Sequence, residues 1–353
     1  MLKLIRPVTQ ASKVGRNAAR NYGGGSIALL TVKELFDLVR DDLVLVEQEL
    51  AQQSAAAIEP VAEISCDLLT GGGKRLRPAV LLLTAAYANY RGPGAIRLAA
   101  VVELIHSATL IHDDVIDSAD TRRGRPSANS RWGNHRSVLA GDWLYMQSFQ
   151  MALRERNFHI LDILIELTQN MVEGELIQLT KLGRIDLTEE DALALATHKT
   201  ACLFSGCARL GAVLGHSDDL QEEALANYGR YAGLAFQLVD DLLDFTASPE
   251  TLGKPVLSDL KEGKVTLPLI YAMQNGDPEG RRLVATVLRE KDFQTVRPEQ
   301  ITALVRESGA LDRARELAHD YARRAKACLN GKAASDYGRA LLAVPDFILE
   351  RDS

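Results

Sequence analysis

The feature that most constrains the fold of this chain is the spacing of its apolar residues. From about Val32 onward, apolar side chains recur at i, i+3, i+4 and i+7 or i+8 in one segment after another, for example at Leu35, Leu38, Val39 and Leu43. This period places them on one face of a helix, whereas a half-buried strand would need strict alternation. Aromatic residues, which strands favour, make up only 5% of the chain. The sequence therefore predicts an all-α protein.

The breaks between the predicted helices are short. Glycine and proline clusters at residues 71–73, 92–94 and 248–249 interrupt the periodic segments, but no Pro/Gly/Ser-rich linker divides the 353 residues. We therefore predict one helical domain over residues 31–353. Residues 1–30 are predicted to be a flexible basic arm, since they carry Lys and Arg but no acidic residue. A transit peptide or a weak membrane-surface contact is the alternative for this arm.

Bulk composition argues against several classes of protein. A formal net charge of −6 gives no reason to expect nucleic-acid binding. The four cysteines are scattered without a C-x-x-C pair, which disfavours a zinc site or a disulfide framework and indicates a reducing compartment. The best apolar run, residues 79–86, is too short to span a bilayer. We therefore expect a cytoplasmic protein.

One acidic pattern occurs twice. Residues 113–117 and residues 240–244 both read D-D-x-x-D, and each copy follows a strongly apolar segment. On a helix the first and last aspartates share a face and repel each other unless a cation lies between them. Mg²⁺ prefers oxygen ligands and combines one or two carboxylates with substrate phosphates. A solvated acidic face is the alternative, which the repetition disfavours. The predicted metal ligands are Asp113, Asp117, Asp240 and Asp244.

A glycine-rich basic turn precedes the first acidic pattern. Residues 71–73 are all glycine, so the backbone can approach an anion closely, and Lys74 and Arg77 follow within one helical turn. Pro78 suits the first turn of a helix. The nucleotide-binding pattern G-x-x-x-x-G-K-[ST] is not matched, because Arg75 stands at its last position. We predict a metal-free diphosphate site here; a plain helix start with solvated cations is the alternative.

Further candidate phosphate ligands surround these motifs. Arg122 and Arg123 are adjacent, and paired arginines can bind phosphate oxygens through two parallel hydrogen bonds. His106 lies two helical turns before Asp113, where it could donate to a phosphate or serve as an ordinary core histidine. A single lysine is more often a surface residue than a ligand. The remaining candidates are Lys199, Thr200, Lys254 and Lys264.

Taken in order, these motifs closely resemble the trans-polyprenyl diphosphate synthase family, in particular its long-chain octaprenyl and solanesyl members. The resemblance extends from about residue 30 to the C-terminus. It implies the isoprenoid-synthase fold, in which antiparallel helices surround a deep central cavity, and normally a homodimer. The stretches that carry it are residues 72–78, 110–117, 122–124, 173–178, 199–201, 233–244 and 259–268.

The resemblance also implies roles for individual residues. Mg²⁺ would be bound by the four aspartates named above, and the catalytic residues would be Asp113, Asp117, Asp240 and Lys199. Isopentenyl diphosphate would be held by Lys74, Arg77, His106 and Arg123. The allylic diphosphate would be held by Arg122, Lys199, Thr200, Gln237, Lys254 and Lys264. Loss of diphosphate would leave an allylic cation, which the double bond of isopentenyl diphosphate attacks, and a proton would pass to the departing diphosphate.

Product length is predicted from two small residues below the first acidic pattern. Thr109 lies one helical turn, about 5.4 Å, before Asp113, and Ala108 is its neighbour. In the family, bulky aromatic residues at these positions resemble short-chain enzymes, whereas Ala-Thr resembles long-chain ones. We therefore expect a hexaprenyl to decaprenyl product that serves as a quinone side-chain precursor and is handed to membrane enzymes. A short-chain (farnesyl or geranylgeranyl) synthase and the catalytic subunit of a heteromeric synthase are the alternatives.

Three other classes fit the sequence less well. A metal phosphohydrolase could use the doublet of His112 and Asp113, but the seven histidines are not placed to supply its other ligands. A class I terpene cyclase shares one acidic helix but would not be expected to carry the second D-D-x-x-D or the basic turn. A non-catalytic subunit conflicts with two intact acidic patterns.

Overall fold

The computed structural model describes residues 30–350 except 56, 71–74, 123, 248–255, 275–277 and 330–334, with the backbone alone at 60 and 68–70. Within these ranges the chain is helical apart from one antiparallel two-stranded ribbon, which confirms the predicted all-α class. The first half contains α1 (Val32–Asp37), α2 (Arg40–Ala55), α3 (Glu59–Thr70), α4 (Leu76–Tyr87), α5 (Pro93–Ile116), β1 (Thr121–Arg122), β2 (Arg125–Pro126), α6 (Ala128–Trp132), α7 (Asn134–Ala152), η1 (Leu153–Glu155) and α8 (Phe158–Lys181).

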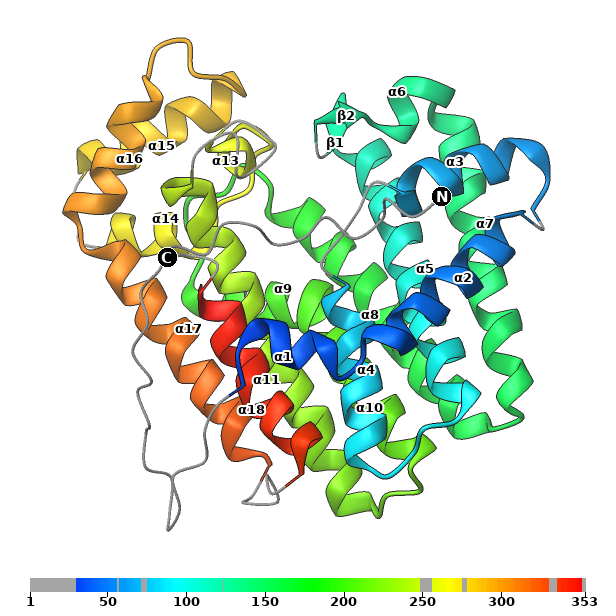
Figure 1. The fold of residues 1–353 in the computed structure, drawn as a ribbon. Helices are drawn as coiled ribbons and strands as arrows, with labels where there is room; N and C mark the ends of the chain where they lie inside the picture. Colours follow the sequence, from blue (N-terminus) through cyan, green and yellow to red (C-terminus); the bar gives the residue numbers. More distant parts are fainter. Residues whose placement is uncertain are drawn as a thin grey trace.

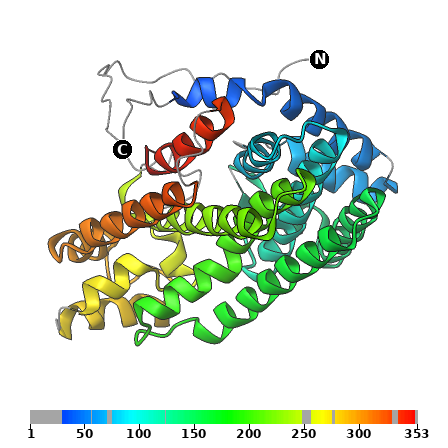
Figure 2. The same cartoon turned by 90° about the horizontal axis from the view of Figure 1, so that it is seen from below.

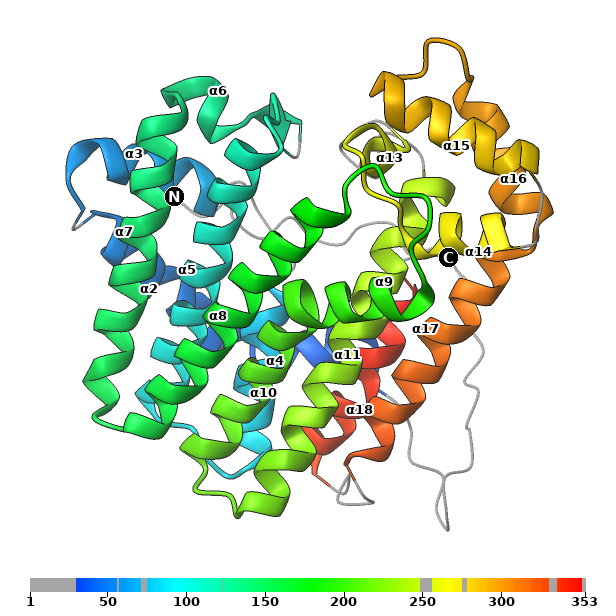
Figure 3. The same cartoon turned by 180° about the vertical axis from the view of Figure 1, so that it is seen from behind.

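The second half of the chain begins with α9 (Glu189–Ala196), the π-helix η2 (Thr197–Ala201), α10 (Cys202–Leu214) and α11 (Asp219–Thr246). It continues with α13 (Ser258–Lys261), α14 (Leu267–Gln274), α15 (Pro278–Glu290), α16 (Pro298–Glu307), α17 (Ala310–Ala327) and α18 (Asp336–Leu349). Long helices lie side by side from α17 through α11 and α10 to α5 and α7 (Figures 1 and 3). Seen from below, the C-terminal helices and the segment from α5 to α8 lie on opposite sides (Figure 2).

Two long helices organise the core. α5 packs against α4 and α7, and α11 packs against α10 and α17, while α10 also contacts α4 and α5. Gly92 in extended backbone and Pro93 in the first turn begin α5. The side chain of Asp218 caps the first turn of α11 by accepting a hydrogen bond from the N–H of Gln221. Both helices end at the same end of the molecule, where the β1–β2 ribbon follows α5 and α13 follows α11 (Figure 1).

By length and composition alone, α5 could cross a membrane, and no other helix in the described ranges meets both conditions. The sequence analysis named residues 79–86 as the best apolar run and therefore missed α5. Within the protein, 72% of its apolar 18-residue window is buried. Leu98, Val101, Leu104 and Ile105 are among its fully buried side chains. Such burial is typical of a core helix of a globular protein.

The last helix docks onto α11 through an unusual hydrogen bond. Pro345 lies inside α18 and has no N–H to donate to the carbonyl group of Leu341, four residues earlier. The buried hydroxyl of Tyr228, on α11, donates to that carbonyl at 2.7 Å. α18 also contacts α1, where the rings of Phe36 and Phe347 meet edge to face at 5.7 Å. α1 therefore packs against α18, which in turn packs against α11 and α4.

Candidate active site

The first acidic pattern lies at the C-terminal end of α5. Asp117 is the C-cap residue, and its side chain and that of Asp113 are both 19% exposed. This end of a helix carries partial negative charge, so two carboxylates here need cations nearby. Lys264, in the segment between α13 and α14, donates to Asp117 at 2.8 Å, and the Nζ of Lys199 lies 3.6 Å from Asp113. Two lysines therefore supply the positive charge that the pattern requires.

Asp114 points about 100° around α5 from Asp113 and lies in a different environment. Its side chain is only 1% exposed, and it accepts a hydrogen bond from the Nε of Arg122 at 2.6 Å. Burial raises the pKa of Asp114, while the positive charge of Arg122 opposes that rise. Arg122, predicted to hold the allylic diphosphate, is thus paired with a carboxylate in this structure.

The second acidic pattern lies near the C-terminal end of α11. Asp240 and Asp241 are half-buried, and Gln237, one turn earlier, donates to Asp241 at 2.8 Å. Burial raises the pKa of Asp241 well above its usual range, although the hydrogen bond from Gln237 opposes the rise. Asp244 is almost fully buried, and its carboxylate accepts a hydrogen bond from the hydroxyl of Ser258 at 3.2 Å. Asp241, which the sequence did not single out, therefore shares a hydrogen-bond network with Gln237.

The π-helix η2 connects the two acidic helices. Lys199 donates to Glu175, on α8, at 2.5 Å and faces Asp113 of α5. The next residue, Thr200, donates through its hydroxyl to Gln237 of α11 at 2.6 Å. One short element thus brings together residues that the sequence predicted for the allylic site. Single π-turns of this kind occur frequently at functional sites.

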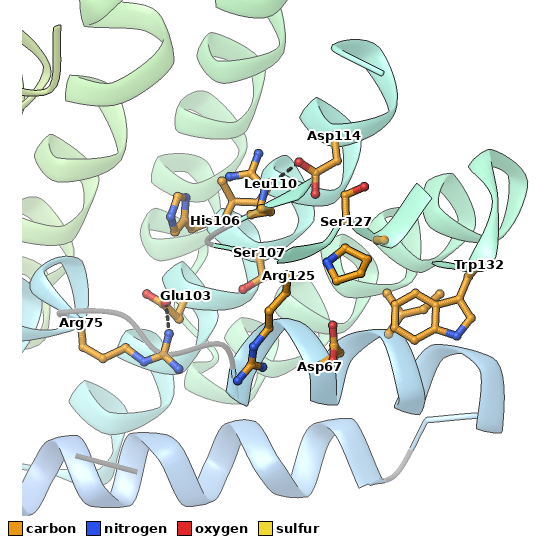
Figure 4. Close-up of a pocket in the computed structure, with 14 residues that line it drawn as sticks. Asp67, Arg75, Glu103, His106, Ser107, Leu110, Asp114, Arg125, Ser127 and Trp132 are labelled. Carbon is orange, nitrogen blue, oxygen red and sulfur yellow. Dashed lines mark hydrogen bonds and ion pairs between the residues drawn. The ribbon is translucent and has the colours of Figure 1, made fainter. Parts of the chain in front are cut away.

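A small pocket of about 50 Å³ lies along the Asp114 side of α5. Arginine side chains and His106 face acidic side chains across this pocket, and Trp132 lies at one end (Figure 4). Its charged and polar lining residues are Asp67, Arg75, Glu103, His106, Ser107, Asp114, Arg122, Arg125 and Ser127. Because the cations converge from α4, α5 and the β1–β2 ribbon, an anion could be bound at this place.

Arg75 is held by the most extensive ion-pair network of this region. It is the N-cap residue of α4 and has left-handed backbone geometry, with φ of 47°. Its guanidinium donates to Glu47 of α2 and to Glu103 of α5, each at 2.5 Å. The sequence had singled out Arg75 only as a mismatch to a nucleotide-binding pattern. Strained backbone held by buried partners is a frequent mark of a functional segment.

The guanidinium of Arg77 is packed against aromatic side chains inside the protein, whereas a simple surface ligand would be exposed to solvent. Its guanidinium is 3.1 Å from the Nε2 of His106 and lies over the rings of Phe204 and Phe236, at 5.0 and 5.7 Å from their centres. Burial lowers the pKa of Arg77, while Glu103 and Asp240 oppose this effect. His106 contacts Arg77 and lines the pocket, and its role as a phosphate donor stays a prediction.

The remaining predicted residues are the pair proposed to set product length, Ala108 and Thr109, and three cationic ligands. Ala108 is fully buried, whereas Thr109 is half-buried and its hydroxyl donates to the carbonyl group of His106 at 2.7 Å. Thr109 is therefore the member of the pair that keeps exposed surface below Asp113. The predicted ligands Lys74, Arg123 and Lys254 lie outside the described residues, as does the basic arm up to residue 29.

The carboxylates fit a divalent cation only together with substrate oxygens. Among the residues that the structure describes, no three His, Cys, Asp or Glu side chains come together to hold a metal ion by themselves. Pairs of carboxylates are nevertheless suitable donors for hard cations that complete their coordination shell with phosphate oxygens and water. The lysine ammonium groups beside Asp113 and Asp117 mark where positive charge is stabilised.

Comparison with known proteins identifies the family. Residues 59–305 match the model of the polyprenyl synthetase family. The chain is 35% identical over 323 residues to octaprenyl diphosphate synthase of Escherichia coli K12, covering 92% of this chain and all of that protein. It is 37% identical over 315 residues to all-trans-nonaprenyl-diphosphate synthase of Rhodobacter capsulatus, covering 89% of this chain and 96% of that protein.

A solved structure shows the same similarity. A polyprenyl synthase from Caulobacter crescentus CB15, complexed with calcium and isoprenyl diphosphate, superposes with a TM-score of 0.87 at 35% identity, covering 92% of this chain and 98% of that one. The solved structure therefore matches this chain over nearly its whole length. The protein described here therefore belongs to the polyprenyl synthetase family and is a prenyltransferase with the isoprenoid-synthase fold.

Proposed function

We propose that this protein is a Mg²⁺-dependent long-chain trans-polyprenyl diphosphate synthase, which adds isopentenyl diphosphate repeatedly to an allylic diphosphate. One observation carries the proposal: η2 connects the acidic ends of α5 and α11 through Lys199 and Thr200. A pocket lined by three arginines and three carboxylates lies beside the same end of α5. An allylic diphosphate with metal and a metal-free diphosphate could thus be held next to each other.

The allylic side is assigned to the carboxylates and to η2. Asp113, Asp117 and Asp240 would hold Mg²⁺, which when bound neutralises the charge on the leaving diphosphate. Asp244 is a weaker candidate, because its buried carboxylate already accepts a hydrogen bond from Ser258. Lys199 would orient the diphosphate through its ammonium group.

The isopentenyl diphosphate side is assigned to the pocket of Figure 4 and its surroundings. His106 lines this pocket and contacts Arg77, so its ring could donate a hydrogen bond to a bound phosphate. Arg122 is bound to Asp114 and lines the same pocket. The apolar helix faces below would exclude water that could otherwise quench an allylic cation.

Thr109 supports a long product, because a half-buried threonine one turn below Asp113 leaves room that an aromatic side chain would fill. The relatives reported above are named for octaprenyl and nonaprenyl products, and identities of 35% and 37% leave the exact length open. The product would be a quinone side-chain precursor that is handed to membrane enzymes, and the protein would act in the cytoplasm.

A homodimer is supported by exposed apolar side chains on adjoining helices. They recur every seven residues on α8, at Phe158, Ile165, Val172 and Leu179, and on α7 and η1, at Leu139, Met146 and Leu153. Seven-residue spacing is typical of helices that pack against other helices. Exposed apolar patches often mark protein–protein interfaces, and a second copy of the chain would cover these stripes.

Incubation of the purified chain with labelled isopentenyl diphosphate and an allylic starter tests the proposed function. We expect diphosphate release that requires both substrates and Mg²⁺, and chromatography should show products of six to ten isoprene units, the class proposed above. Release of phosphate without isopentenyl diphosphate would instead support a phosphohydrolase. A dominant farnesyl or geranylgeranyl product would contradict the long-chain assignment. Asp113→Ala should lower turnover by at least ~10²-fold.

A further inference from the structure

We infer that Gly174 and Gly233 are positioning residues that set where the π-helix η2 presents Lys199 and Thr200 to the allylic diphosphate. The inference rests on the proposed function and adds to it two residues that do not touch substrate. Three observations carry it: the position of η2 between α8 and α11, the contacts that a side chain at either glycine would make, and the hydrogen bonds that η2 forms on both sides.

Gly174 lies on α8, where that helix faces η2. A Cβ atom at residue 174 would lie 2.9 Å from the Cβ of His198, 3.1 Å from the backbone N of Lys199 and 3.2 Å from the carbonyl carbon of His198. These are atoms of the π-helix backbone or bonded directly to it, so no side-chain rotation relieves the contacts. Alanine would require η2 to move by a few tenths of an ångström.

Gly233 has the same relation to η2 from the side of α11. A Cβ atom there would lie 2.6 Å from the Cα of Ala201, 3.0 Å from the Cβ of Phe204 and 3.1 Å from the Cβ of Ala201. This contact is closer than the one at Gly174 and also involves backbone. The π-helix is therefore confined between two helices at positions where neither carries a side chain.

Small displacements of η2 would reach the site directly. Lys199 lies in the middle of η2, 3.6 Å from Asp113, and Thr200 donates to Gln237 at 2.6 Å. A π-helix is rare and occurs mostly as a single turn, so it persists only where surrounding packing favours it. A shift of about 1 Å at a residue that orients substrate can cost about 10²-fold in rate.

The variants Gly174→Ala and Gly233→Ala test this inference. Gly206→Ala is the matched control, because its added Cβ would meet Leu167 Cδ2, the far end of a flexible side chain, at 2.6 Å, with the next atom at 3.7 Å. Equilibrium dialysis should measure farnesyl diphosphate binding with Mg²⁺ and, separately, isopentenyl diphosphate binding without metal. We expect farnesyl diphosphate to bind about 10-fold more weakly to Gly174→Ala and about 10²-fold more weakly to Gly233→Ala.

Isopentenyl diphosphate binding should stay within about twofold of wild type in Gly174→Ala, because the nearest contacts of its added Cβ are all with η2. Gly233→Ala also contacts Phe204, whose ring packs against Arg77, so it is expected to weaken isopentenyl diphosphate binding as well. The control should bind both ligands normally. Unchanged farnesyl diphosphate binding in the glycine variants, or equal weakening of both ligands in Gly174→Ala, would overturn the positioning role. Gly174→Ala makes the milder contact and decides the matter if Gly233→Ala does not fold. A wild-type protein that binds neither ligand would overturn the proposed function, and this inference with it.

Discussion

Replacing Arg75 by alanine should destabilise the protein, and the structure gives the size of the effect. Arg75 is 13% exposed, and its loss removes the guanidinium from Glu103, whose side chain is 9% exposed, and from Glu47, whose side chain is 35% exposed. Removing one partner of a buried ion pair costs about 3–5 kcal/mol. Glu47 is partly exposed and can be hydrated again once Arg75 is removed. We therefore expect the lower end of this range, a loss of about 3 kcal/mol in the free energy of unfolding.

Two further variants separate the causes of this loss. Glycine at residue 75 should be about 1 kcal/mol more stable than alanine, because φ is 47° there and left-handed backbone is costly for residues with a Cβ. Glu103→Gln in the Arg75→Ala background should recover about 1–2 kcal/mol, because it removes the buried charge that was left behind. Arg40→Ala is the control, since that arginine is 56% exposed and its pair with Asp37 should contribute less than about 1 kcal/mol.

Urea denaturation followed by far-UV circular dichroism measures all four variants. The reasoning is refuted if Arg75→Ala lies within about 1 kcal/mol of wild type. It is also refuted in part if glycine is no more stable than alanine, because the left-handed backbone would then carry no cost. Isopentenyl diphosphate binding should weaken in Arg75→Ala as well, since Arg75 lines the proposed pocket.

Three other outcomes are expected. Thr109→Phe should shorten the product, as shown by chromatography of the prenyl alcohols, and an unchanged length distribution would exclude Thr109 from the proposed floor. Val172→Glu should give a monomer in analytical ultracentrifugation, because it places a charge in the exposed apolar stripe; a variant that still sediments as a dimer would exclude this surface. The pKa of Asp191 is lowered to about 2, mainly by Lys181, so its contribution to stability should be complete above pH ~4 and lost toward pH ~2. Asp191→Asn should remove that part of the acid dependence of the melting temperature.

The helices and both acidic patterns could be predicted because the information is local. The apolar period fixes helical faces over a few turns, and the D-D-x-x-D spacing fixes which carboxylates share a face. The different direction of Asp114 follows from the same geometry, because consecutive residues lie about 100° apart around a helix. The assignment of the chain to its family rested on motifs that are contiguous in the sequence, and the comparisons confirmed it.

What could not be predicted depends on contacts between distant segments. The pairing of Arg122 with Asp114 requires the turn after α5 to fold back. The tether of Arg75 joins α2, α4 and α5, and nothing in the local pattern around residue 75 indicates it. The π-helix depends on the packing of α8 and α11 against residues 197–201, and a period of 3.6 residues does not reveal it.

The hydrogen bond from Tyr228 to Leu341 ties the stability of the acidic helix to the end of the chain. A chain shortened before α18 would leave the phenol group of Tyr228 without its acceptor and would open the apolar face of α11 to water. Tyr228→Phe would instead leave the carbonyl group of Leu341, four residues before Pro345, without its hydrogen-bond donor. The fourteen-residue helix α18 thus acts as a brace for α11, the helix that carries the second acidic pattern.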